Sequence, residues 1–235
     1  KIGESMKGMK IALPKEFYAE GINDEVKAAV LKAAEEYKAM GAELIECSMP
    51  SLKYAVPCYY LLACAEAASN LSRYDGIKYG HRTLTADSYE ELIIKSRSEG
   101  FGDEVKRRIM LGTFVLSSGF YDAYYKKAKL VQKRIMQEFA SQFADVDVIA
   151  TPTVPSTAFK IGENTDDPLK MYANDICTVT VNIAGLPAIS IPCAYDDKGL
   201  PVGMQLIGGK FTEQRLLNTA YAYEQLVGGF KMPEL

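Results

Sequence analysis

Hydrophobic residues recur with two different periods in the first part of the chain. An apolar run at residues 9–14 ends at a proline, which is typical of a short strand. Apolar residues then recur at helical spacing over 25–40, behind Asn23 as a cap, and Gly41 ends this helix. A second apolar run follows at 42–47. The order of strand, helix and strand predicts a right-handed crossover with two parallel strands side by side.

The middle of the chain is predicted to be helical. Residues 55–74 are rich in alanine and nearly uncharged, which indicates a helix packed on most sides. Its polar exceptions, Glu66 and Asn70, are then expected to need partners. Amphipathic spacing predicts three further helices, at 88–98, 103–111 and 120–143.

The last part of the chain returns to the strand pattern. A buried-type strand at 145–152 ends in proline and leads into a polar loop that reaches Pro168. Two more strands, at 188–193 and 203–208, flank an Asp-Asp-Lys-Gly turn signal and predict an antiparallel hairpin. A helix at 213–226 follows. Together with the parallel pair near the start, this predicts an α/β fold with a mixed sheet flanked by helices.

The composition is that of a globular protein with one large domain or a pair that shares a core. The 235 residues include 27 basic and 30 acidic ones, and the net charge of −3 gives no basic field for a nucleic-acid backbone. Direct contact with nucleic acid is therefore not expected. Apolar runs such as 184–192 are shorter than the ~20 residues that cross a bilayer, so no membrane contact is expected. The basic residues of 120–143 are typical of a solvated helix face, with a partner surface as the alternative.

Cysteine and histidine positions argue against a metal site or a thiol enzyme. The five cysteines form no Cys-x-x-Cys pair, which favours buried thiols in a reducing cytoplasm over disulfides, a zinc site or a nucleophile. His81 is expected at the surface, and the adjacent acids Asp166 and Asp167 are typical of a turn, with a metal pair as the alternative. No metal or cofactor is expected in this chain. The cysteines are Cys47, Cys58, Cys64, Cys177 and Cys193.

Three polar residues in apolar contexts are the candidate binding site. Arg108 could hold the carboxylate of an α-amino acid, Asp175 its ammonium group, and the hydroxyl of Tyr59 could complete the cage. Spacing alone leaves other interpretations open: an ordinary helix ion pair for Arg108, a helix cap for Asp175 and core packing for Tyr59. No Gly-x-Ser-x-Gly motif and no phosphate-binding loop is present in the sequence.

Several segments resemble a known family of enzymes. Those shared with the carboxy-terminal half of the amidase signature family are DPLKMYAND at 167–175, NIAGLPAISIP at 182–192 and LPVGMQLIG at 200–208. Those that are similar to one branch of it, the glutaminase subunits of tRNA-dependent amidotransferases, are SNLSRYDG at 69–76, EVKRRIMLG at 104–112 and SSGFYDAYY at 117–125. The resemblance runs from about residue 10 to residue 226 and implies the amidase signature fold, carboxy-terminal part only.

The resemblance also implies a function for a longer protein. Residues 1–235 would be the carboxy-terminal portion of a single amidase signature domain whose amino-terminal catalytic half is absent. Such a subunit hydrolyses glutamine to ammonia in the cytoplasm. A second subunit holds the tRNA and uses ATP and Mg to convert Glu-tRNA(Gln) to Gln-tRNA(Gln). A small third subunit completes the complex. The family's glutamine contacts fall on Tyr59, Arg108 and Asp175.

The sequence departs from the family in its catalytic residues. The family uses a lysine, a serine in a cis peptide and a nucleophilic serine, the last two within a Gly/Ser-rich stretch. No such stretch is present, and the adjacent serines Ser117 and Ser118 match a different part of the pattern. We therefore expect no catalytic residue and no turnover from this chain alone. The absence of an initiator Met predicts a start within a longer protein. The alternatives are part of a free-standing amidase of the family, or a non-catalytic binding or assembly module.

Overall fold

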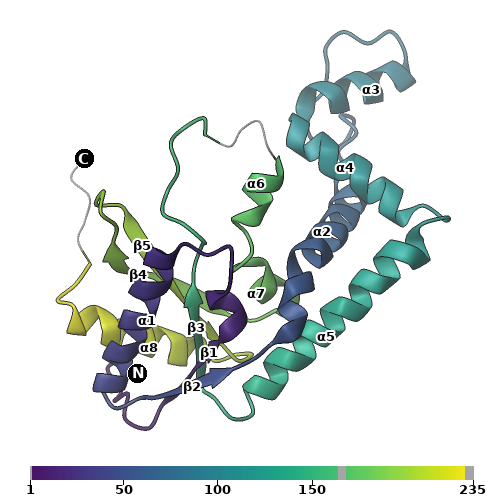
Figure 1. The fold of residues 1–235 in the computed structure, drawn as a ribbon. Coiled ribbons are helices and arrows are strands. Elements are labelled where there is room, and N and C mark those ends of the chain that lie inside the picture. The colour runs from purple at the N-terminus through teal and green to yellow at the C-terminus, as the bar shows by residue number, and fades with distance from the viewer. Residues whose placement is uncertain (1, 164–167, 231–235) are drawn as a thin grey trace. The chain divides into compact units, whose positions relative to one another are not determined.

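The structure is a computed structural model that describes residues 2–163 and 168–230. The chain divides into two compact units, and each is described by itself. The sheet unit consists of Lys1–Val56 and Gln132–Leu235, and the helical unit is Pro57–Val131. Figure 1 shows all the strands in the sheet unit and labels the elements.

The sheet unit is built on one mixed sheet of five strands in the order β2-β1-β3-β5-β4. β1 is parallel to both β2 and β3, whereas β5 is antiparallel to both β3 and β4. This arrangement confirms the predicted parallel pair, the predicted hairpin and the mixed α/β class. The strands are β1 (Lys10–Pro14), β2 (Glu43–Cys47), β3 (Val148–Pro152), β4 (Ala188–Tyr195) and β5 (Pro201–Gly208).

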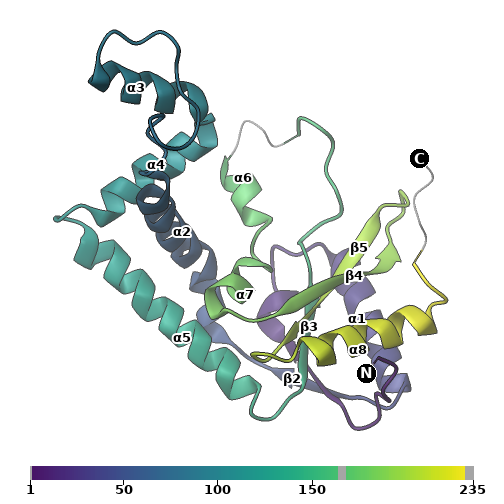
Figure 2. The same cartoon turned by 180° about the vertical axis from the view of Figure 1, so that it is seen from behind.

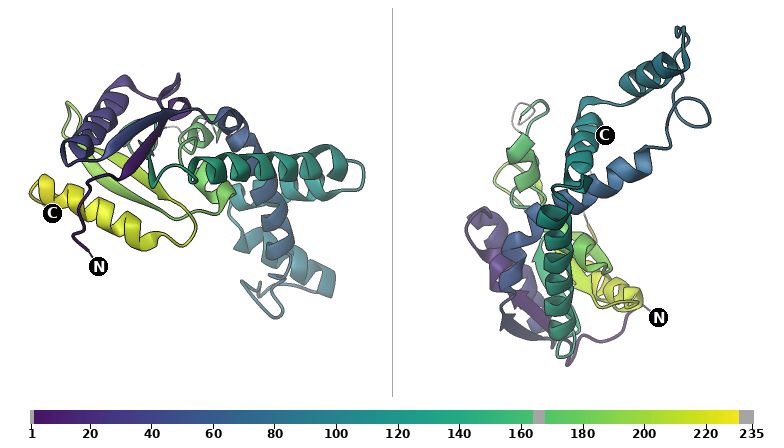
Figure 3. Two further views of the ribbon diagram at one scale, coloured as in Figure 1. Left: turned by 90° about the horizontal axis from the view of Figure 1, so that it is seen from below. Right: turned by 90° about the vertical axis from the view of Figure 1, so that its right-hand side faces the viewer.

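Two helices pack together against this sheet. The side chain of Asn23 accepts a hydrogen bond from the Glu25 N–H at 2.8 Å and caps α1 (Asp24–Ala39), as predicted. The hydroxyl of Tyr37 on α1 donates to the carbonyl of Thr219 on α8 (Glu213–Leu226) at 2.9 Å. Figures 2 and 3 show α8 beside β4 and β5. Because β3 is buried along its whole length, the core of the unit lies at the centre of the sheet.

The stretch NIAGLPAISIP covers the end of α7 (Val179–Ala184), the link at 185–187 and the first part of β4. Gly185 ends α7 with φ 67° and ψ 47°, a left-handed conformation that residues with a Cβ rarely adopt. Its N–H donates to the carbonyl of Val181 at 2.9 Å and completes the last turn. Pro187 follows and cannot continue a helix, so the chain turns directly into the strand.

The helical unit contains no strand among its described residues. Most of α2 (Ala55–Leu71) and the first part of α5 (Lys127–Gln142) belong to it. Between them lie α3 (Tyr89–Gly100), α4 (Asp103–Leu116) and a π-helical segment, η3 (Tyr121–Lys126). Short segments elsewhere in the chain are η1 (Lys15–Tyr18), η2 (Pro50–Tyr54) and α6 (Pro168–Ala173).

The structure corrects three predictions about the helices. The helix expected at 55–74 ends at Leu71, and its polar exceptions Glu66 and Asn70 are exposed, so they need no buried partners; most of its other residues are buried or half-buried, as predicted. The single helix expected at 120–143 is divided into η3 and α5. The short helices α6 and α7 were not predicted, since six residues are too few to show a helical period. Among the described residues, no helix is long and apolar enough to cross a membrane.

Candidate functional site

Arg108 lies in the first half of α4, where the sequence places acids and bases one turn apart. Its Nε donates to Oε1 of Glu104 at 2.9 Å, four residues earlier on the helix. Arg107 donates to the other oxygen of the same carboxylate. The hydrogen bond with Glu104 raises the pKa of Arg108 above its ordinary value, so this guanidinium is a permanent cation. The helix ion pair that the sequence left open is thus present.

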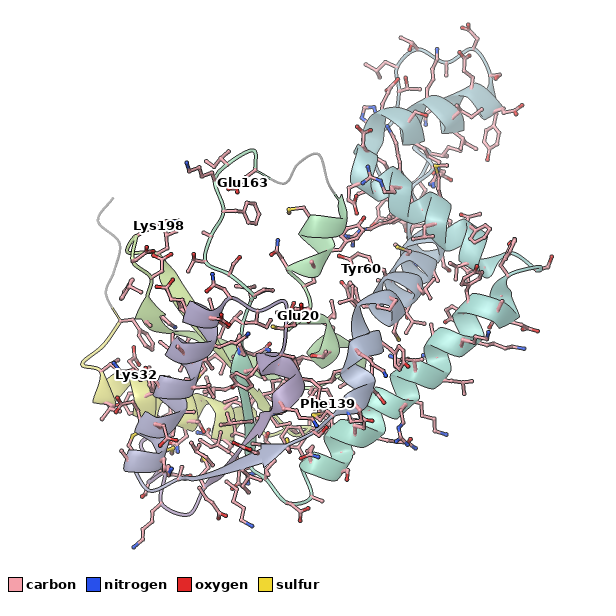
Figure 4. All side chains as sticks on the ribbon, in the orientation of Figure 1. Glu20, Lys32, Tyr60, Phe139, Glu163 and Lys198 are labelled. Atoms are coloured by element: carbon pink, nitrogen blue, oxygen red, sulfur yellow. The ribbon has the colours of Figure 1, made fainter. Side chains whose placement is uncertain are left out.

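An aromatic ring lies against the same guanidinium. The central carbon of the Arg108 guanidinium is 5.5 Å from the centroid of the Tyr60 ring, within cation–π distance. Tyr60 is buried, whereas Tyr59 is half-buried and meets the Tyr60 ring edge-on, with centroids 5.3 Å apart. Figure 4 labels Tyr60 on α2. The tyrosine in contact with Arg108 is therefore the neighbour of the one that the sequence singled out.

Two helices approach each other closely near this contact. A Cβ atom on Gly112 of α4 would lie 1.9 Å from the carbonyl oxygen of Cys64 on α2. No side chain fits there, so a glycine is required for the two helices to touch. Gly112 is four residues beyond Arg108, and Cys64 is four residues beyond Tyr60. The contact between Arg108 and the Tyr60 ring thus lies about one helical turn along each helix from this close approach.

Asp175 lies in the sheet unit, in the turn between α6 and α7. Its carbonyl accepts from the N–H groups of Thr178 and Val179, both at 3.0 Å. The N-cap residue of α7 is Thr178, so the cap interpretation of Asp175 is wrong. The carbonyl of Cys177 accepts from Nε2 of Gln205 at 3.1 Å, and this buried bond fastens the turn to β5. Asp175 is thereby held by its backbone, with a half-buried side chain.

The predicted cage is distributed over both units. Tyr59 and Arg108 belong to the helical unit and Asp175 belongs to the sheet unit. Within the helical unit the structure brings Arg108 together with Glu104 and Tyr60, which sequence analysis did not name. The spacing of four residues between Glu104 and Arg108 was the available signal. A cage that includes Asp175 stays a prediction.

The other reactive residues have structural roles. His81 is exposed, as predicted, and its Nε2 pairs with Glu99 at 2.8 Å. None of the five cysteines forms a disulfide. Burial raises the pKa of Cys47 to about 11 and those of Cys177 and Cys193 to about 12, so these thiols stay protonated at neutral pH.

No metal-binding cluster of His, Cys, Asp or Glu occurs in the described ranges. Asp166 and Asp167, the candidates for a metal pair, lie outside those ranges. An apolar cavity of about 420 Å³ is present in the sheet unit, lined mainly by α5 and the ends of α7 and β5. Its lining is mostly apolar, and its polar members, Lys133, Gln137 and Lys210, include no acid, thiol or hydroxyl. The polar cluster around Arg108 is therefore the stronger candidate.

Comparison with known proteins identifies the class. A family model for amidases matches residues 1–217, and the chain belongs to this family. The mixed sheet is shared with solved amidases, among them a bacterial aryl acylamidase with a TM-score of 0.71. The match covers 94% of this chain and 44% of the acylamidase. The two sequences are only 17% identical, so this match shows a shared fold and nothing about function.

More similar relatives share a particular name. The A subunit of glutamyl-tRNA(Gln) amidotransferase from Brevibacillus brevis is 58% identical over 97% of this chain, and that of an Exiguobacterium species is 55% identical over all of it. The crystal structure of the Thermotoga maritima counterpart has a TM-score of 0.76 at 39% identity, over 99% of this chain. The chain spans about half the length of these relatives: 47% and 48% of the two sequences and 47% of the solved chain.

Proposed function

We propose that this chain is the carboxy-terminal part of the glutaminase subunit of a glutamyl-tRNA(Gln) amidotransferase, and that it supplies the groups that bind glutamine. The observation that carries the proposal is the similarity, at 55–58% identity over nearly the whole chain, to the A subunits of such amidotransferases. The branch-specific segment at 104–112 supports it, because it forms the helix that holds Arg108. The solved A subunit matches 99% of this chain, so the similarity extends over nearly the whole fold.

The binding groups suit a free α-amino acid. Arg108 pairs with the α-carboxylate of glutamine and Asp175 with its ammonium group, and the Tyr59 hydroxyl adds a hydrogen bond. A permanent cation and a carboxylate together select substrates that carry both charges, so a simple amide without them binds poorly. The remaining catalytic groups, a lysine and two serines, belong to the half of the family pattern that this chain lacks. The chain alone is therefore inactive.

The complete glutaminase works with two other proteins in the cytoplasm. Its ammonia passes to the partner that holds Glu-tRNA(Gln) and uses ATP and Mg, and a small third subunit completes the complex. The net charge of −3 agrees with this division, because the glutaminase has no need to grip the RNA backbone. No cofactor is assigned to this chain.

The test compares two sources of ammonia in the complete amidotransferase. Arg108→Ala and Asp175→Ala each remove one charged contact, which costs about 2–4 kcal/mol of transition-state binding. Glutamine-dependent amidation should fall at least ~30-fold by that conversion. The reaction supplied with ammonium chloride should be unchanged, since it bypasses the glutamine site.

Two controls keep this test specific. Lys106→Ala removes a half-exposed cation of the same helix, and Asp197→Ala removes an exposed acid of the sheet unit, so both should leave the rates unchanged. Equal loss of ammonia-dependent activity would show that Arg108 and Asp175 hold the fold or an interface instead. Equal hydrolysis of glutamine and simple amides would identify a free-standing amidase.

The inactivity of the isolated chain is tested separately. Purified chain should release no ammonia from glutamine or from simple amides, because the activated nucleophile supplies most of the rate. Ammonia release that scales with the chain and survives repurification would contradict the proposal.

A further inference from the structure

Glu104 is bound by two arginines in a way that uses both of its oxygens. Arg108 donates Nε to Oε1, and Arg107 donates to Oε2. The side chain of Glu104 is 42% exposed, and exposed ion pairs add little to folding stability. Two arginines and one glutamate leave one net positive charge, so the group still attracts an anion. These pairs therefore matter less for stability than for the orientation of the side chains that they join.

The contacts of Arg108 fix the plane of its guanidinium. The bond from Nε to Glu104 sets how the plane is rotated, and the Tyr60 ring lies against the group at 5.5 Å. A guanidinium has five N–H donors in a rigid fork, and Nε is only one of them. Because Nε already donates to Glu104, the edge formed by Nη1 and Nη2 can pair with a carboxylate through two parallel hydrogen bonds. Holding Nε therefore directs that edge.

The point where α2 and α4 meet lies near the ring. Gly112 on α4 approaches the carbonyl of Cys64 on α2, and these two residues are four positions beyond Arg108 and Tyr60. A substrate-binding group held by packing on one side and by a hydrogen bond on the other is preorganised, which lowers the cost of binding.

We propose that Glu104 is a positioning residue for Arg108, which orients the Nη1 and Nη2 edge to receive the α-carboxylate of glutamine, with Tyr60 as the supporting surface. The inference rests on the proposed function, and it concerns Glu104 and Tyr60, which are not among the predicted binding residues. It makes Glu104 act through Arg108, so its removal should weaken glutamine binding and leave the chemical step unchanged.

The experiment measures KM and kcat for glutamine in the complete amidotransferase. Glu104→Ala should raise the KM about 10-fold, the effect of losing one charge-assisted hydrogen bond, with kcat unchanged. Glu104→Gln keeps an oxygen that accepts from Nε and should raise the KM by less. Asp103→Asn, an exposed acid on the same turn, is the matched control and should have no effect.

The double variant separates this inference from the proposed function. When Arg108→Ala is already present, Glu104→Ala should add no further loss, because the group that it positions is gone. A raised KM in Arg108→Ala with a normal KM in Glu104→Ala would overturn the positioning role and leave the clamp intact. A normal kcat/KM for glutamine in Arg108→Ala would overturn both. A loss of ammonia-dependent activity in Glu104→Ala would show a structural role and overturn the inference.

Discussion

The two units of the chain are held together in different ways. The sheet unit has a core of large side chains without solvent exposure, including Tyr37, Ile149 and Leu206. In the helical unit, Val115 is the one such residue among the largest fully buried side chains of the described ranges. Met110 is 73% exposed there and Leu130 67%. The sheet unit is thus stabilised mainly by apolar burial, whereas the helical unit depends on close backbone contact and local hydrogen bonds.

This difference teaches where each unit tolerates change. A core of interdigitated side chains spreads its energy over many residues. A unit with few buried side chains concentrates its stability in the few places where its helices touch, and Gly112 is such a place. The apolar side chains that α4 and α5 expose are also a surface on which a further polypeptide could pack.

The largest effect is expected from Gly112→Ala. The new methyl group would overlap the carbonyl of Cys64, so α2 and α4 must separate, at a cost of about 3 kcal/mol. Gly119→Ala in the same unit is the control, because nothing lies within 4 Å of its Cβ position. Hydrogen exchange followed by mass spectrometry should show faster exchange in peptides from 57–131 of the first variant alone. Equal exchange in both variants would refute the dependence on close contact.

A smaller effect is expected from Gln205→Leu in the sheet unit. The substitution removes the donor to the carbonyl of Cys177 and to the Thr151 hydroxyl, and the groups left buried cost about 1–3 kcal/mol. Urea denaturation should show this loss, and exchange should rise in the turn that holds Asp175. Gln225→Leu changes an exposed glutamine in the same way and should be neutral. An equal loss in the free energy of unfolding for both variants would show that the buried hydrogen bonds of Gln205 do not stabilise the unit.

The smallest effect concerns the loop that precedes α3. Hydrogen bonds from His81 and Thr83 hold the pKa of Glu99 below its ordinary value of 4.5. A carboxyl with a lowered pKa in the folded state contributes stability above pH 4.5, which is lost as the pH falls through the folded value. NMR titration of the Thr83 amide should therefore show a change below pH 4.5.

Two variants check the origin of this acid transition. Glu99→Gln removes the titrating group and should abolish the change in the Thr83 amide. Glu90→Gln alters an exposed acid at the start of the same helix and should preserve it. A transition that persists in Glu99→Gln would assign it to another carboxyl.

The sequence determined those features that depend on neighbours along the chain. Asn23, Gly41 and the apolar periods specify the first strand, helix and strand, because caps and periodicity are local. The Asp-Asp-Lys-Gly turn specifies the hairpin of β4 and β5 for the same reason. The pairing of Glu104 with Arg108 was also within reach, since residues four apart share a helix face.

The tertiary structure alone decided contacts between distant segments. The choice of Tyr60 over Tyr59 as the partner of Arg108 depends on where α2 and α4 touch, and the sequence near either helix does not specify that point. The anchoring of the Asp175 turn depends on Gln205, which lies far along the chain and in another element. Many pairs of distant residues are compatible with the sequence pattern of each helix or strand. Only a few of these pairs let the side chains fill the interior of the unit without overlap, so packing over the whole unit selects the contacts.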